Sequence, residues 1–300
     1  MEQRQGGEPS PRRGPRSNAG QAAGGESDRG ASGAIDEVAA VRGLPRAGRD
    51  RFPPQHVPWS IYHAFALLGF YLVVSVFLSA LAEVGFPSLT DDTGPWVDAA
   101  KAGMQMGGSQ ALFLLVAYTF LKDRAGGGAR AGRVLGLEIH QPGRAVRKAI
   151  APIVMGTGVL LVWVAVQNVL IQKLGWKLPE QGIVERVHHT VSAGGPHELA
   201  MFVVLTVVVA PVVEEVLFRG LLYLPLRAAL GPVSAALGVS LLFAFIHLPA
   251  LVALVPTFLL AVLLTWLMER TRTIWAPIVG HMLFNSVGMI LIVRSALEAQ

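Results

Sequence analysis

The chain has 300 residues, of which 52% are hydrophobic and 15% charged, with a net charge of +5 and no cysteine. Soluble domains carry about 25% charged residues, so this composition indicates an integral membrane protein. The absence of cysteine excludes disulfides, thiolate zinc sites and cysteine nucleophiles. The basic residues lie between apolar runs rather than on one soluble face, so the lipid bilayer is an expected partner and nucleic acid is not.

The N-terminal segment, residues 1–57, is rich in Gly, Arg, Ala, Ser and Pro and poor in large apolar side chains. Such a segment cannot bury enough apolar surface to offset the entropy cost of ordering. We therefore expect a disordered tail at 1–57, followed by a transmembrane domain at 58–300.

Seven apolar segments follow, each near the roughly 20 residues that a helix needs to cross a bilayer core. They are residues 59–82, 99–121, 147–171, 197–223, 229–248, 250–268 and 273–293. The predicted fold class is all-α, a polytopic transmembrane helical bundle of about seven spans. Lys101, Gln105 and Gln110 make the second span the least apolar of them.

The loop charges predict the orientation of the bundle. Arginines precede the first span, only acidic charges follow it, and residues 122–148 again carry many basic side chains. Basic loops are retained on the inner side of the membrane. The N-terminus is therefore expected to be cytoplasmic and the C-terminus to lie outside.

Two glutamates and an arginine interrupt the fourth apolar segment, in the sequence VVEEVLFRGLL at 212–222. Glu215 and Arg219 are four residues apart, so they share a helix face and can form an ion pair. Glu214 is rotated by about 100° from Glu215 and has Phe218, not a cation, four residues on. A charged residue inside a membrane span normally faces the bundle or a wet cavity, so the partner of Glu214 is expected on another span.

Two later segments carry polar residues at helical spacing. FAFIH at 243–247 places Phe243 and His247 on one face, and HMLFN at 281–285 does the same for His281 and Asn285. Each feature alone has a simpler explanation, since Glu215 with Arg219 could only join helices, and His281 with Asn285 could supply interhelical hydrogen bonds. The three features together favour one polar site inside the bundle. If the fifth helix is straight and starts near residue 229, however, His247 is expected nearer the outer face than Glu214. The two meet at one depth if that helix starts deeper, if the loop around 224–232 dips into the bilayer, or if the helix is strongly tilted.

In this order and on separate spans, EExxxR (Glu214, Glu215, Arg219), FxxxH (Phe243, His247) and HxxxN (His281, Asn285) resemble the CPBP family of intramembrane proteases. That family includes CAAX prenyl endopeptidases and bacteriocin-processing or immunity proteins. The sequences RGLL and WAPIVGHMLFN are also similar to the family. The resemblance covers residues 197–293, the motif-bearing core.

The resemblance implies hydrolysis of a peptide bond in or near the membrane. It assigns Glu214 and His247 to water activation, His281 and Asn285 to stabilisation of the oxyanion, and Glu215 with Arg219 to the scaffold of the site. The implied substrate is a peptide or lipidated protein. A prenylated CAAX-type C-terminus and a bacteriocin-like peptide are both compatible with it.

The motif residues are compatible with hydrolysis either with or without a catalytic metal. Glu214, His247 and His281 could form a Zn²⁺ site with two histidines, one carboxylate and an open position for water. The HExxH pattern of zincins is absent from the sequence. His188, His189 and His197 lie in or beside an outer loop, where we expect them to be solvated.

Two other classes of function are compatible with parts of this pattern. A catalytically silent adaptor or immunity protein could use the same fold to bind a peptide, and a proton-coupled transporter could use Glu214 and the histidines as a relay. The complete set of motif residues favours the enzyme over the adaptor. The lack of an internal repeat counts against the transporter.

Overall fold

The protein is described by a computed structural model. It describes residues 56–85, 95–138, 142–176, 182–192, 196–248 and 251–299, all of which belong to one unit, Arg51–Gln300. The expected tail at 1–57 lies outside the described residues except for its last two positions.

Every regular element in these ranges is helical, as the sequence predicts. The helices are α2 (Ile61–Gly85), α3 (Pro95–Ala102), η1 (Gly103–Gly108), α4 (Ser109–Ala125), α5 (Gly128–Val134), α6 (Pro142–Leu174), α7 (Gly182–Ser192), α8 (Pro196–Val204), η2 (Leu205–Val209), α9 (Ala210–Glu215), η3 (Val216–Tyr223), α10 (Leu224–Leu230), α11 (Pro232–Phe245), α12 (Leu251–Thr271) and α13 (Trp275–Glu298). The segments named η are π-helical.

Within the described residues, six helices rather than seven are long and apolar enough to cross a membrane. The exception is the fifth predicted span, 229–248, because α11 has only 14 residues. Gly231, at φ 80°, and Pro232 separate α11 from the helix before it. Proline is favoured in the first turn of a helix and a glycine at positive φ ends the preceding one, so the chain starts α11 late.

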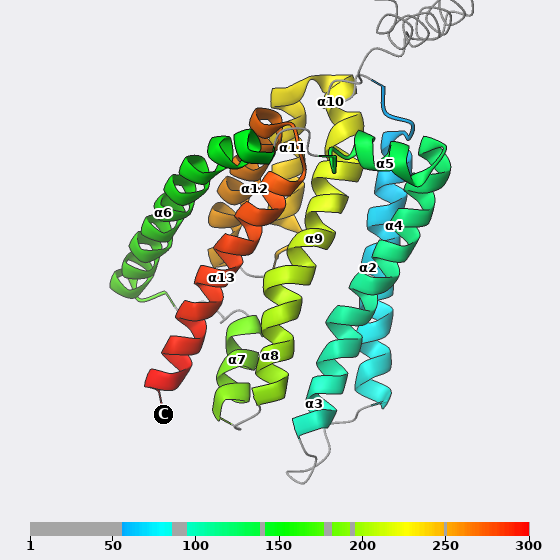
Figure 1. Cartoon of the computed structure of the whole chain (residues 1–300). Helices are drawn as coiled ribbons and strands as arrows, with labels where there is room; N and C mark the ends of the chain where they lie inside the picture. The colour runs from blue at the N-terminus through cyan, green and yellow to red at the C-terminus, as the bar shows by residue number, and fades with distance from the viewer. Residues whose placement is uncertain are drawn as a thin grey trace, which may run out of the picture. The chain divides into compact units, whose positions relative to one another are not determined.

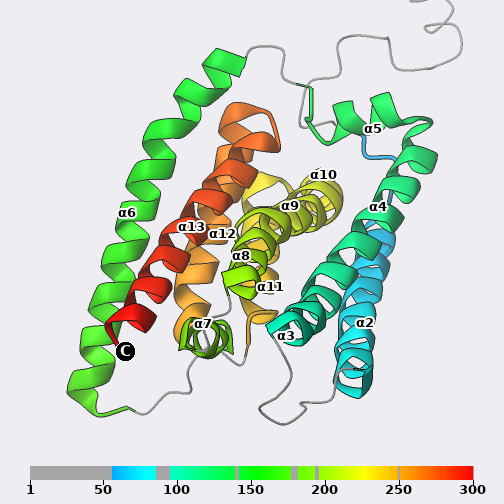
Figure 2. The ribbon, with the colours of Figure 1, turned by 60° about the horizontal axis from the view of Figure 1, so that its bottom comes forward.

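The continuous helical segment Pro196–Leu230, built from α8 to α10, lies between two groups of helices. On one side α4 packs against α9, and α2 packs against both α4 and η3. On the other side α11, α12 and α13 follow, and α6 packs against α12 and α13 (Figures 1 and 2). The central segment therefore contacts both groups, and its polar residues can reach either of them.

The outer helices expose apolar side chains, as a lipid environment requires. Val73, Val76 and Phe77 of α2 are more than 60% exposed, and α6 exposes Val154 and Met155 by 59% and 70%. A soluble protein rarely leaves such continuous apolar surface uncovered. The protein is an integral membrane protein, and these faces are its contact with the bilayer.

The polar residues of the second predicted span have specific partners. Lys101 Nζ lies 2.5 Å from Glu83 Oε2 at the end of α2, and Gln105 Nε2 donates to Glu83 Oε1 at 3.0 Å. The helix therefore continues from Pro95 to Ala125 with these polar groups turned toward α2 rather than toward lipid. Gln110 is also buried, but its side-chain oxygen has no partner among the described residues.

Candidate active site

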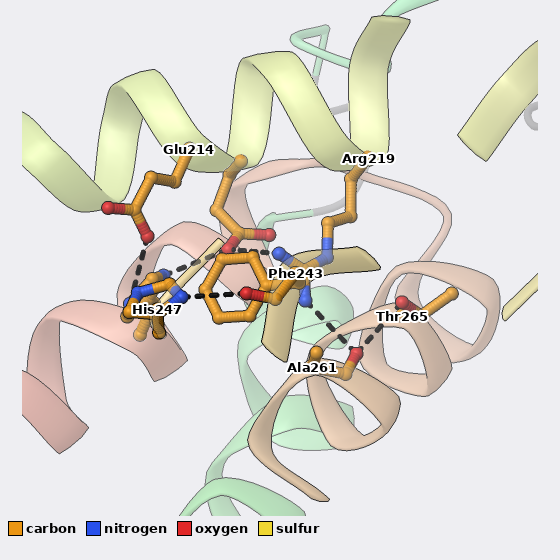
Figure 3. Close-up of polar contacts among 8 residues, drawn as sticks. Glu214, Arg219, Phe243, His247, Ala261 and Thr265 are labelled. Carbon is orange, nitrogen blue, oxygen red and sulfur yellow. Dashed lines mark hydrogen bonds and ion pairs between the residues drawn. The ribbon is translucent and has the colours of Figure 1, made fainter. Parts of the chain in front are cut away.

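Glu215 and Arg219 form the ion pair that their spacing predicts. Arg219 Nη1 donates to Glu215 Oε1 at 2.7 Å, and both side chains are fully buried. Arg219 Nη2 also donates to the backbone oxygen of Ala261 on α12 at 3.0 Å, and its guanidinium lies 5.1 Å from the centre of the Phe243 ring. The pair therefore joins the central segment to α11 and α12 (Figure 3).

His281 of α13 connects the two glutamates. Its Nδ1 lies 2.9 Å from Glu215 Oε1, and its Nε2 lies 3.7 Å from Glu214 Oε2. The partner of Glu214 thus comes from another span, as the sequence predicts. Because a carboxylate only accepts hydrogen bonds, Nδ1 carries a proton in this arrangement. Glu214, His281, Glu215 and Arg219 form one connected polar chain across α9, η3 and α13.

His247 lies in the turn that follows α11. Its Nδ1 is 2.7 Å from the backbone oxygen of Phe243, so Nδ1 donates and a neutral ring keeps a free lone pair on Nε2. The Phe243 ring, which is fully buried, contacts the His247 and His281 rings at centroid distances of 4.7 and 5.9 Å. Phe243 therefore packs the site rather than facing lipid.

The helix that precedes His247 is short. α11 has 14 residues and rises only about 21 Å, less than the roughly 30 Å hydrocarbon core. It ends at Phe245, and the turn after it carries His247, which lines the same cavity as Glu214. The expectation that His247 lies nearer the outer face than Glu214 stays a prediction.

Asn285 is held by a backbone group that a proline leaves free. In η2 the N–H of Ala210 donates to Leu205 O, five residues back. In the same register the donor to Thr206 O would be the N–H of Pro211, which proline lacks. Asn285 Nδ2 donates to this oxygen at 2.9 Å. One amide hydrogen of Asn285 thus fixes the side chain, and the second remains available.

Glu214, His247, His281 and Asn285 all line one cavity of about 1120 Å³. Glu215 and Arg219 do not line it, and lie behind Glu214 and His281 in the protein interior. Glu214 is the more accessible carboxylate, with its side chain 19% exposed against none for Glu215. The arrangement places one carboxylate, two imidazoles and an amide around a space that can hold water and a peptide.

A three-ligand metal site is not assembled in this arrangement. Among the residues that the structure describes, no group of three or more His, Asp or Glu side chains is placed to hold a metal ion. His281 Nδ1 bonds Glu215, and its Nε2 lies 3.7 Å from Glu214 Oε2. The Zn²⁺ set of Glu214, His247 and His281 is not gathered around one point here, and it stays a prediction.

Sequence reasoning missed three participants. The carbonyls of Ala261 and Thr206 accept from Arg219 and Asn285, and backbone acceptors carry no side-chain pattern. For Thr206, Pro211 five residues later was an available signal. His188 was expected to be solvated in or beside the outer loop, but it lies on α7 and lines the cavity, and its buried Nε2 has no hydrogen-bond partner among the described residues.

Comparison with known proteins adds a family to this geometry. Residues 196–287 match the model of the Rce1-like family, described as type II CAAX prenyl endopeptidase Rce1-like. The resemblance to the CPBP family is confirmed. The matched segment holds all three motifs and supports a protease, a hydrolase of the CAAX endopeptidase type. No curated protein and no solved structure was found to match the chain.

Proposed function

We propose that this protein, which resembles the CPBP family, hydrolyses a peptide bond of a prenylated, CAAX-type substrate within the membrane, with water activated by Glu214 and His247. The observation that carries the proposal is the meeting of Glu214 and His281 from two helices, at a cavity that also includes His247 and Asn285. A large cavity with a few convergent polar groups is the usual form of a catalytic site.

In the proposed mechanism a water molecule lies between Glu214 and His247. Glu214 accepts a proton from the water while the water oxygen attacks the carbonyl carbon of the scissile bond. The lone pair on Nε2 of His247 accepts the second hydrogen of the water and orients it. Glu214 then returns the proton to the leaving amine, so the reaction consumes one water and restores the site.

The negative charge that develops on the carbonyl oxygen requires donors. The free amide hydrogen of Asn285 supplies one, and His281 supplies another from Nε2 when the ring carries protons on both nitrogens. Donors fixed by folding stabilise such charge without reorganising during the reaction. Glu215 and Arg219 hold His281 in place through Nδ1, which makes them positioning residues.

Purified protein in lipid nanodiscs provides the test, with an S-farnesyl CAAX peptide as substrate. Replacing Glu214 with Gln should lower cleavage by about 10²- to 10⁴-fold, the usual contribution of a general base. The melting temperature should stay close to that of the wild type, because Glu214 is partly accessible and its partner can retain water. Near-normal cleavage by Glu214→Gln would contradict the assignment, and unfolding would make Glu214 structural.

The same assay tests the question of Zn²⁺. Because the arrangement does not gather Glu214, His247 and His281 around one point, cleavage should survive dialysis against a chelator. Elemental analysis of the purified protein provides an independent measurement. Loss of activity on chelation, restored by added zinc, would show that the side chains rearrange to bind it.

A further inference from the structure

The cavity extends well beyond the four motif residues. It is bordered along α13 from His281 to Ser295, a length of roughly 21 Å at 1.5 Å per residue. It also reaches α7 at Val184 and His188. The proposed chemistry uses only one end of this space, so the remainder requires its own explanation.

Three polar atoms on the walls of this remainder have no hydrogen-bond partner among the described residues. They are Oε1 of Gln110, Oγ1 of Thr206 and Nε2 of His188, each buried, and all three residues line the cavity. We call Gln110, Thr206 and His188 the distal polar groups. Buried polar atoms in native proteins are nearly always paired, so atoms that face a cavity are paired by its contents.

The order of the distal polar groups follows from helix packing. A Cβ on Gly103 would meet the Met201 side chain, and one on Gly107 would meet Leu205, so η1 runs parallel to α8 and η2. Continuing this register places Gln110 at the level of residue 208, between Thr206 and Glu214. Thr206 precedes Glu214 by eight residues, or roughly 12 Å along the helix, and its carbonyl accepts from Asn285, so it lies on the side of the cavity nearest that amide.

An extended peptide matches this spacing. It advances about 3.3 Å per residue, so the distance from Glu214 to Thr206 corresponds to three or four residues. Its backbone offers both donors and acceptors, and an amide, a hydroxyl and an imidazole can pair with either kind. Lys and Arg are absent from the described lining of the cavity, so the lining favours a neutral backbone over a strongly anionic ligand.

We infer that the distal polar groups form a subsite that binds the backbone of an extended substrate three to four residues away from the scissile bond. Water occupies these atoms when no peptide is bound, and an entering peptide replaces it. The subsite thereby helps to align the scissile bond with Glu214. The inference rests on the proposed peptidase function for its choice of ligand, but its test does not require catalysis.

Binding is measured on the Glu214→Gln protein, which separates affinity from cleavage. The probes are an S-farnesyl CAAX peptide with four residues before the modified cysteine and three after it, and two shortened forms that keep only one residue on one side. In the Glu214→Gln background, Gln110→Leu and Thr206→Val should each weaken binding of the long peptide by about five- to tenfold, the value of one hydrogen bond. One of the shortened peptides lacks the residues that reach the subsite. Its dissociation constant should be the same for the Glu214→Gln protein with and without each further substitution.

Two matched controls identify general effects of the substitutions. Gln172→Leu and Thr119→Val make the same chemical changes at exposed positions that do not line the cavity. Both should leave every dissociation constant unchanged. His188→Phe should reduce affinity for the long peptide in the same direction as Gln110→Leu.

Equal loss of affinity for all three peptides would overturn the inference, because the substitutions would then act on the whole cavity. Unchanged affinity for the long peptide, or no binding of it, would overturn it as well. If the long peptide shows the expected length-dependent loss but wild-type protein cleaves none of the probes, the subsite stands and the proposed peptidase function fails.

Discussion

Two glutamate–arginine pairs join the central segment to α12, and they differ in their surroundings. Arg219 with Glu215 is completely buried and also contacts Ala261 O of α12. Arg227 pairs with Glu269 at the end of α12, where both side chains are 24% exposed. The same chemistry thus occurs once in the interior and once near the end of the bundle.

The difference lies in what each pair must offset. Removing two charges from water costs several kcal/mol per ion, and the interior pair offsets this through its mutual ion pair and its bonds to His281 and Ala261 O. The Arg227 pair retains water, and Tyr223 Oη adds a hydrogen bond to Glu269 Oε1 at 2.8 Å. We interpret the interior pair as support for the proposed catalytic residues, and the Arg227–Glu269 pair as a contact that only joins α10 to α12.

The interior pair should give the largest effect. Arg219→Ala or Glu215→Gln leaves a buried charged or polar group without its partner, which typically costs about 3–5 kcal/mol of folding free energy. Cleavage should also be lost, because His281 loses the group that orients it. Thermal and denaturant unfolding in detergent, beside the cleavage assay, provide the measurement. A stable, fully active Glu215→Gln protein would remove the distinction between the two pairs.

The second pair should give a smaller effect. Glu269→Gln removes charge-assisted hydrogen bonds from Arg227 and Tyr223 in a partly wet position, so we expect a loss of about 1–2 kcal/mol. Cleavage per folded molecule should change less than twofold. The readouts are the same as for Glu215→Gln. Loss of activity without loss of stability would give Glu269 a catalytic role that its position does not suggest.

Much of this arrangement is legible in the sequence. The i, i+4 spacing predicts the Glu215–Arg219 pair, and the lack of a helical partner for Glu214 predicts a contact from another span. The end of α11 at Phe245 could not be predicted, because helix periodicity does not say where a helix stops. The carbonyls of Ala261 and Thr206 are hidden for a different reason, since every residue has one and only packing selects them.

The predicted membrane orientation can be tested from both aqueous sides. Thr273 Oγ1 donates to Gly136 O at 2.7 Å, so the turn that follows α12 lies against the segment after α5, within the basic region 122–148. Cysteines placed at Arg130 and Ser192, both exposed, should be labelled from opposite sides, with Arg130 cytoplasmic. The natural chain has no cysteine to interfere. Labelling of both from one side would contradict the predicted topology.

An exposed pair on α13 should give the smallest effect. Arg294 and Glu298 are four residues apart, with side chains 74% and 63% exposed. Exposed helix pairs of this kind contribute about 0.3–0.5 kcal/mol, so Arg294→Ala should leave stability and cleavage nearly unchanged. This variant calibrates the series of unfolding measurements. A loss comparable to that of Arg219→Ala would mean that exposure does not determine the strength of these pairs.

The π-helical turns of η3 have a consequence for both pairs. Glu215, Arg219, Tyr223 and Arg227 occur at every fourth position, and in an ideal α-helix each step would drift by roughly 40° around the axis. A π-helix has more residues per turn, so η3 reduces this angular drift and keeps Arg219, Tyr223 and Arg227 directed at α12. The wide turns of η3 therefore align two separate contacts along α12, that of Arg219 with Ala261 O and that of Arg227 with Glu269.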